Sequence, residues 1–129
     1  MRIVIDYESA QSESRFRGIG RYTSSIIKAL IRNKNKEDEI ILVLNGAFKD
    51  SIEQIRADFY GLLPQENIRV FYPSNYSEDI DNIIKESVLN TLKPDVVIVA
   101  GSDEVGKSYF EEKKRLYPLK YVYLTEYIL

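Results

Sequence analysis

The feature that most constrains the fold is a regular alternation of short apolar runs with longer amphipathic segments. The apolar runs are rich in Val and Ile, which favours strands that are buried on both faces. The amphipathic segments repeat apolar residues with the period of a helix. The expected strands cover residues 2–6, 40–44, 68–71, 95–100 and 121–125, and the expected helices cover residues 18–33, 50–59, 77–92 and 104–115. This alternation predicts an α/β fold with a parallel sheet and helices on both faces.

The length of 129 residues suits a single domain with its own core, covering residues 1–129. Right-handed crossovers leave few topologies for such a chain. We expect a Rossmann-like three-layer sandwich of about five strands in the order 3-2-1-4-5. In this order the first and fourth strands are neighbours, and ligands bind at their carboxyl ends. The long loop of residues 7–17 and the segment Gly101-Ser102-Asp103 are expected to face that crevice.

Arginines and glycines surround the expected start of the first helix, which reads Arg15-Phe16-Arg17-Gly18-Ile19-Gly20-Arg21-Tyr22. The first turn of a helix has backbone N–H groups without intrahelical partners, and the helix dipole adds positive potential. Together these features suit an anion. Arg15, Arg17 and Arg21 oppose the dipole by roughly 0.3–1 kcal/mol each when exposed, so a negative group is expected to compensate them.

The other expected helix starts follow the preferences of the helix dipole. Ser77 is a favourable N-cap followed by three acidic residues, and residues 50–53 resemble a capping box. Two interpretations of the arginine-rich start therefore remain open. In one, an anionic ligand or substrate binds there. In the other, the arginines pair with the nearby carboxylates of Asp6, Glu8 and Glu13.

Histidine and cysteine are both absent from the sequence. Their absence excludes a Ser-His-Asp triad, a Cys-His pair and a zinc site built on His or Cys, and we expect neither a metal nor a cofactor. The formal net charge of −2 gives no general affinity for nucleic acid. No apolar run approaches the roughly 20 residues that a membrane helix needs. The N-terminal residues read as a strand rather than a signal peptide, so we expect a cytoplasmic location.

One string matches a nucleotide-binding pattern. Gly101, Gly106, Lys107 and Ser108 have the spacing of a P-loop and follow an expected strand. However, the acidic residues at positions 103 and 104 would lie inside the loop and repel phosphate. A small P-loop-like nucleotide binder remains an alternative, as does a stand-alone α/β binding or interaction module. A dinucleotide fingerprint is excluded at the first helix, because Thr23 occupies the position of its third glycine.

The opening Met-Arg-Ile-Val-Ile-Asp, the pair Ala10-Gln11 and the segment from Ser14 to Tyr22 resemble the start of GT-B glycosyltransferases of the group 1 family. The resemblance is to bacterial mannosyltransferase-like members in particular. Residues 93–99 and 123–129 fit the same family in order and spacing. The family implies two Rossmann-like domains that face each other across a cleft. The acceptor binds mainly to the N-terminal domain and the nucleotide-sugar mainly to the C-terminal one.

By this resemblance, the chain is the N-terminal domain of a longer, retaining hexosyltransferase in polysaccharide biosynthesis. Its partners would be a nucleotide-sugar donor and a glycan or lipid-linked acceptor, with peripheral membrane contact in the full-length enzyme. The residues implied at the phosphate are Arg17, Gly18, Ile19, Gly20 and Arg21, with Arg15, Ser102 and Glu126 in the cleft. Many relatives carry a His-Asp pair after the fifth strand, where this chain has Thr125-Glu126, so no catalytic residue is assigned. We expect the isolated chain to be inactive and to self-associate through residues 121–129.

Overall fold

The computed structural model describes residues 1–11, 18–100 and 117–124, with the backbone alone described for residues 18–21. The strands are β1 (Arg2–Asp6), β2 (Glu39–Asn45), β3 (Ile68–Phe71), β4 (Val96–Ala100) and β5 (Tyr121–Leu124). The α-helices are α1 (Gly18–Asn33), α2 (Lys49–Asp58) and α3 (Glu78–Thr91), and two 3-10 helices are η1 (Glu8–Gln11) and η3 (Gln65–Asn67). The helix expected at residues 104–115 lies outside the described residues.

The five strands form one sheet in the order β3-β2-β1-β4-β5, and every pair of neighbours is parallel. Ile5 in the central strand is aligned with Leu42 of β2 on one side and Ile98 of β4 on the other. The predicted α/β fold and strand order are therefore confirmed. The switch point lies between β1 and β4, because the chain adds β2 and β3 on one side of β1 and β4 and β5 on the other.

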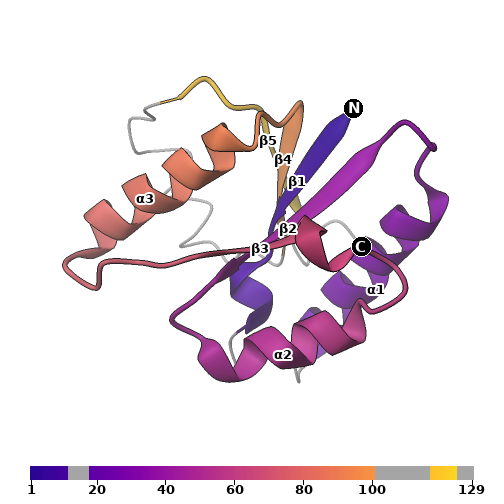
Figure 1. Ribbon diagram of the computed structural model, residues 1–129, viewed down its shortest axis with the longest axis horizontal. Helices are drawn as coiled ribbons and strands as arrows, with labels where there is room; N and C mark the ends of the chain where they lie inside the picture. Colours follow the sequence, from indigo (N-terminus) through magenta and orange to yellow (C-terminus); the bar gives the residue numbers. More distant parts are fainter. Residues whose placement is uncertain (12–17, 101–116, 125–129) are drawn as a thin grey trace.

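Helices cover both faces of the sheet, with α1 and α2 on one face and α3 on the opposite face (Figure 1). Successive residues of a strand point to opposite faces, and β1 shows this alternation. Ile3 and Ile5 pack with Ile27 of α1 and with Phe59 after α2. Val4 instead packs in a second cluster with Leu89 of α3. The sheet thus has two apolar faces and two cores, as a doubly covered parallel sheet requires.

The buried side of α3 differs from the sequence expectation. The helical period placed Ile80, Ile83, Ile84, Val88 and Leu92 together on the sheet side. Ile84, Val88 and Leu92 do pack against the core, but Ile80 is 37% exposed and Ile83 is 43% exposed. Figure 1 gives the reason, because the N-terminal end of α3 projects away from the strands. The residues that α3 buries are Lys85, Glu86 and Leu89.

The starts of two helices test the predicted caps. Ser77 caps α3 as expected, since its hydroxyl accepts a hydrogen bond of 3.1 Å from the Ile80 N–H. The capping box predicted at residues 50–53 is wrong: α2 begins one residue earlier, with Phe48 at the N-cap position and no side-chain cap. Among the described residues, no helix has the length and apolar character needed to cross a membrane.

Candidate functional site

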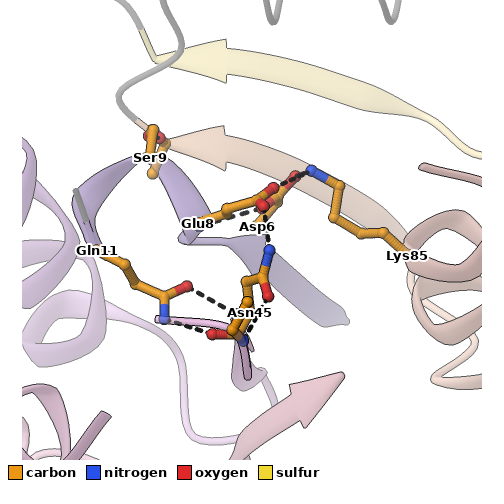
Figure 2. A network of polar contacts seen from close by, with 8 residues as sticks. Asp6, Glu8, Ser9, Gln11, Asn45 and Lys85 are labelled. Carbon is orange, nitrogen blue, oxygen red and sulfur yellow. Dashed lines mark hydrogen bonds and ion pairs between the residues drawn. The ribbon is translucent and has the colours of Figure 1, made fainter. Parts of the chain in front are cut away.

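The carboxyl ends of β1 and β2 carry a group of polar side chains that contact one another (Figure 2). Asp6 ends β1, Glu8 and Gln11 belong to η1, and Asn45 ends β2. Lys85 reaches the group from α3 on the other side of the sheet (Figure 2). We call Asp6, Glu8, Gln11, Asn45 and Lys85 the switch-point network, because it lies beside the strand pair where the sheet order reverses.

Lys85 forms the charged centre of this network. Its Nζ lies 2.6 Å from Glu8 Oε2 and 3.1 Å from Asp6 Oδ2, and its side chain is 8% exposed. Burial by itself would lower the pKa of this ammonium group, but the negative charges of Asp6 and Glu8 outweigh burial and raise the pKa above its usual value. Lys85 therefore stays protonated, which suits an ion-pair role and excludes that of a nucleophile or general base near neutral pH.

Each carboxylate oxygen of Asp6 and Glu8 has a partner. The Glu8 N–H donates to Asp6 Oδ1 at 3.2 Å, and the Asn45 side-chain amide donates to Glu8 Oε1. The remaining oxygen of each carboxylate contacts Lys85. A buried ion pair of this kind is tolerated only when further hydrogen bonds satisfy the rest of its polar atoms. These contacts hold η1, the first part of the loop between β1 and α1, in a fixed position.

Gln11 extends the network to the neighbouring strand and helix. Its side-chain amide accepts from the Asn45 N–H at 2.6 Å and donates to the Asn45 carbonyl at 2.9 Å. It also donates to Ser51 Oγ of α2 at 3.1 Å. Gln11 thus satisfies the backbone of Asn45 at the point where β2 ends, as a further strand residue would. This contact fixes η1 against β2 and the start of α2.

The same loop is fastened on its other side to β4. The Ser9 hydroxyl donates to the carbonyl of Ala100, the last residue of β4 (Figure 2). The N–H of Tyr7 donates to the Val43 carbonyl of β2 at 3.0 Å, which continues the strand pairing one residue beyond β1. The β1–α1 loop is therefore attached to both neighbours of β1 before it reaches the start of α1.

The comparisons with known proteins give one partial similarity. The chain is 36% identical over 72 residues to the serotype-specific mannosyltransferase WbdA of Escherichia coli, and the match covers 55% of this chain. The relationship is glycosyltransferase-like. The matched part spans only 8% of the length of WbdA. No family model matches the chain, and no solved structure matches it.

The glycine segment predicted to bind phosphate lies at the start of α1. Gly18, Ile19, Gly20 and Arg21 are the first four residues of that helix, and its first turn contains no acidic residue. Its start follows the loop that the switch-point network holds, at the end of the sheet where α/β proteins bind ligands. The backbone positions predicted for phosphate binding therefore occupy a helix N-terminus, the element that suits an anion.

Other predicted site residues lie outside what the structure describes. They are Arg15, Arg17, Ser102 and Glu126, together with the P-loop-like residues Gly101, Gly106, Lys107 and Ser108 and the acidic Glu13. For Arg21 the backbone is described but the side chain is not. The interpretation that Asp6 and Glu8 pair with the arginines concerns side chains outside the described residues, whereas within the described residues both carboxylates pair with Lys85.

Sequence reasoning missed Lys85 and the bridging role of Gln11. A lysine in a helix usually indicates an exposed position, and its partner Glu8 is 77 residues away in the chain. One signal was present, because Lys85 is four residues before the buried Leu89 and so shares its helix face. For Gln11 the signal was its place in a loop that directly follows a buried strand.

Proposed function

We propose that this chain is the acceptor-side Rossmann-like domain of a retaining glycosyltransferase, which moves a sugar from a nucleotide-sugar to a glycan or lipid-linked acceptor. The observation that carries the proposal is the 72-residue similarity to a mannosyltransferase. It is supported by a parallel sheet whose switch point is followed by a glycine-containing helix start. Both features belong to proteins that bind phosphate groups at the carboxyl edge of a sheet.

In this proposal the start of α1 binds the diphosphate of the donor. The N–H groups of Gly18, Ile19 and Gly20 donate hydrogen bonds to phosphate oxygens, while Arg17 and Arg21 supply positive charge. Negative charge on the diphosphate grows as the bond to the sugar breaks. Fixed donors and cations that face this charge lower the barrier without a histidine. Arg15, Ser102 and Glu126 would line the same cleft.

The switch-point network supports this assignment through its charge. Asp6 and Glu8 are two of the three acidic residues that closely precede the arginines in the sequence, the third being Glu13, and they would compete with phosphate for the arginines. Lys85 contacts both carboxylates, at 3.1 and 2.6 Å. A carboxylate that already has a buried cationic partner attracts a second cation less strongly. The contacts of Lys85 therefore favour pairing of the arginines with an external anion rather than with Asp6 or Glu8.

The nucleotide and the sugar would be held mainly by a second domain of the full-length enzyme. The chain on its own is then expected to transfer no sugar, because transfer requires donor and acceptor to be held in one geometry. Binding of the diphosphate is the part of the function that this domain can show by itself. Peripheral contact with a membrane would follow if the acceptor is lipid-linked.

A direct test follows the backbone amides of the chain by ¹⁵N-NMR while GDP or UDP is added at constant ionic strength. The proposal predicts that the amide signals of Gly18, Ile19 and Gly20 shift in a saturable way. Sodium chloride at the same ionic strength is the control and should leave these signals in place. Shifts that are absent, or equal in nucleotide and chloride, would refute a diphosphate site at α1.

A further inference from the structure

The loop between β3 and α3 presents two tyrosines to solvent at the same edge of the sheet. Tyr72 directly follows β3 and is 71% exposed, and Tyr76 precedes the N-cap of α3 and is 83% exposed. Burial of such large aromatic side chains by a ligand is favourable, so two exposed tyrosines in one loop after β3 can contribute to binding. We call Tyr72 and Tyr76 the tyrosine platform.

The ring of Tyr72 packs against the backbone of Gly46, just after the end of β2. A Cβ atom added to Gly46 would lie 2.4 Å from Cδ1 and 2.5 Å from Cε1 of the Tyr72 ring. The Gly46 N–H donates to the Phe71 carbonyl at 2.7 Å, which fixes the backbone of Gly46 beside the ring. Only glycine leaves room for the ring here. One side of Tyr72 therefore rests on backbone, while most of the side chain faces solvent.

The loop that carries Tyr76 is held by Asp81 of α3. Asp81 Oδ1 accepts hydrogen bonds from both the N–H and the hydroxyl of Ser74, each at 2.7 Å, and from the Asn75 N–H at 3.3 Å. The hydrogen bonds from Ser74 lower the pKa of Asp81, so the carboxylate stays ionised near neutral pH. The Tyr76 N–H donates to Ser74 Oγ at 3.1 Å, and Asn75 has a left-handed φ of 61°. A turn fixed in this way loses little further conformational freedom when it binds a ligand.

The charges around the platform decide what class of ligand it fits. The first turn of α3 contains Glu78, Asp79 and Asp81, and no lysine or arginine occurs between Arg69 and Lys85. Acidic residues repel phosphate, nucleic acid and anionic lipid headgroups. A neutral ligand with apolar faces and many hydroxyl groups meets no such repulsion. Its hydroxyls have hydrogen-bonding partners in the tyrosine hydroxyls and the Asn75 side chain.

We propose that Tyr72 and Tyr76 form a subsite for a neutral glycan, the acceptor of the sugar transfer; this inference rests on the proposed function. The faces of aromatic rings carry negative charge density, which attracts the C–H groups on the flat side of a pyranose. Adjacent strands lie about 4.8 Å apart, so the end of β3 is about 10 Å from the end of β1. This separation is within the length of a short glycan, so a glycan on the platform can reach the end of β1, where the loop toward the proposed diphosphate site begins.

The test measures binding of neutral trisaccharides to the whole chain. The probes are an α-linked mannotriose, an α-linked glucotriose and a β-linked N-acetylglucosamine trimer. Binding is detected by saturation-transfer NMR and by changes in the ring signals of ¹³C-labelled tyrosine. At least one probe should bind and shift the Tyr72 and Tyr76 signals. Tyr72→Ala should weaken its Kd about tenfold, whereas Tyr72→Phe, which keeps the ring, should change it little.

Two further variants separate the platform from general effects of mutation. Gly46→Ala moves the Tyr72 ring from its packed position without removing it, so it should also weaken binding. Tyr60→Ala is the matched control, because Tyr60 is 79% exposed but follows α2, at the opposite end of the strands. Thermal melts confirm that each variant is folded. The inference is overturned if no trisaccharide binds, or if Tyr72→Ala binds as the parent does.

Failure of this inference is distinguishable from failure of the proposed function. The GDP and UDP titration reports on the amides of α1, and it does not depend on the platform. If the diphosphate shifts occur without glycan binding, the platform assignment is wrong and the proposed function stands. If neither ligand binds, both are wrong.

Discussion

The ammonium group of Lys85 lies 2.6 Å from the carboxylate of Glu8, a residue 77 positions earlier in the chain. The contact joins α3, on one face of the sheet, to the loop that leaves β1. Asp6, at the end of β1, shares the same cation at 3.1 Å. The fold therefore places a buried lysine in contact with the loop that leads to the start of α1.

The first prediction concerns the stability that depends on this lysine. Lys85→Met should lower the free energy of unfolding by about 3–5 kcal/mol, because it leaves two buried or half-buried carboxylates without a cation. Urea unfolding measures this loss. Lys36→Met is the matched control, since Lys36 is exposed, and it should change stability by no more than about 0.5 kcal/mol.

The same experiment can separate lost pairing from lost packing. Adding Asp6→Asn and Glu8→Gln to Lys85→Met removes the unpaired charges and should recover part of the lost stability. The ion-pair account is wrong if Lys85→Met costs no more than Lys36→Met, or if the triple variant is less stable than the single one.

The second prediction is a loss of stability at high pH that depends on Tyr7. Burial raises the pKa of Tyr7 to about 12, whereas an unfolded tyrosine titrates near 10. Between these values the unfolded state has lost the proton and the folded state keeps it, so stability falls as pH rises. Tyr7 therefore leaves stability independent of pH below pH 10, and its effect is a loss of about 1.4 kcal/mol per pH unit between pH 10 and pH 12.

Urea unfolding of the parent and of Tyr7→Phe between pH 8 and pH 12 measures this contribution. Lys85, whose folded pKa is also raised, contributes stability that is complete below about pH 10.4 and is lost as pH rises further. That second contribution is shared by both proteins, so their difference isolates Tyr7. Equal slopes against pH for parent and variant would contradict the assignment.

The third prediction concerns the starts of α2 and α3, for both of which the sequence predicted a side-chain cap. Ser77→Ala should destabilise the chain by about 1 kcal/mol, because it removes the hydroxyl that accepts from the Ile80 N–H. Asp50→Ala should cost only a few tenths of a kcal/mol, since Asp50 lies within the first turn of α2 and does not cap it. Thermal unfolding of both variants decides the matter, and a larger cost for Asp50→Ala would show that α2 is capped differently.

The fourth prediction concerns the edge of the sheet. Among the described residues β5 pairs with β4 alone, and Val122 in it is 43% exposed. An edge strand with unpaired backbone groups can pair with a second copy, so we expect self-association through residues 121–129 at high concentration. Sedimentation should show that Val122→Lys reduces it, while Tyr60→Lys does not. A parent chain that remains monomeric at high concentration would contradict this expectation.

The arrangement of strands could be predicted from the sequence because it depends on short, local patterns. The apolar run around Ile5 reads as a strand without further information, and right-handed crossovers then leave few orders for the sheet. The exposure of Ile80 and Ile83 could not be predicted in this way. Helical periodicity identifies the apolar side of α3, but it does not reveal how far the helix extends past the strands.

The switch-point network depends on contacts between distant parts of the chain. Asp6 looked like a possible partner for the nearby arginines because sequence proximity was the only guide to its contacts. Its observed partner, Lys85, comes from a helix that is brought to the end of β1 only when the sheet forms. Likewise Gln11 gains its role from the backbone of Asn45, which belongs to another strand. No local pattern specifies either contact.

In the proposed function, the arginines at the start of α1 bind an anionic group of a substrate. A ligand that binds only the folded chain stabilises it by RT ln(1 + [L]/Kd). Thermal melts of the parent in phosphate or GDP, compared with chloride at equal ionic strength, therefore measure this binding. The matched variants are Arg17→Ala and Arg21→Ala, with Arg32→Ala in the last turn of α1 as the control.

The parent should melt at a higher temperature in phosphate or GDP than in chloride. The increase should be smaller for Arg17→Ala and Arg21→Ala, and unchanged for Arg32→Ala. Without ligand, the variants should melt close to the parent, because the carboxylates of Asp6 and Glu8 are paired with Lys85. The opposite result would contradict the claim: variants that lose stability without ligand, and a parent that melts at the same temperature in phosphate, GDP and chloride.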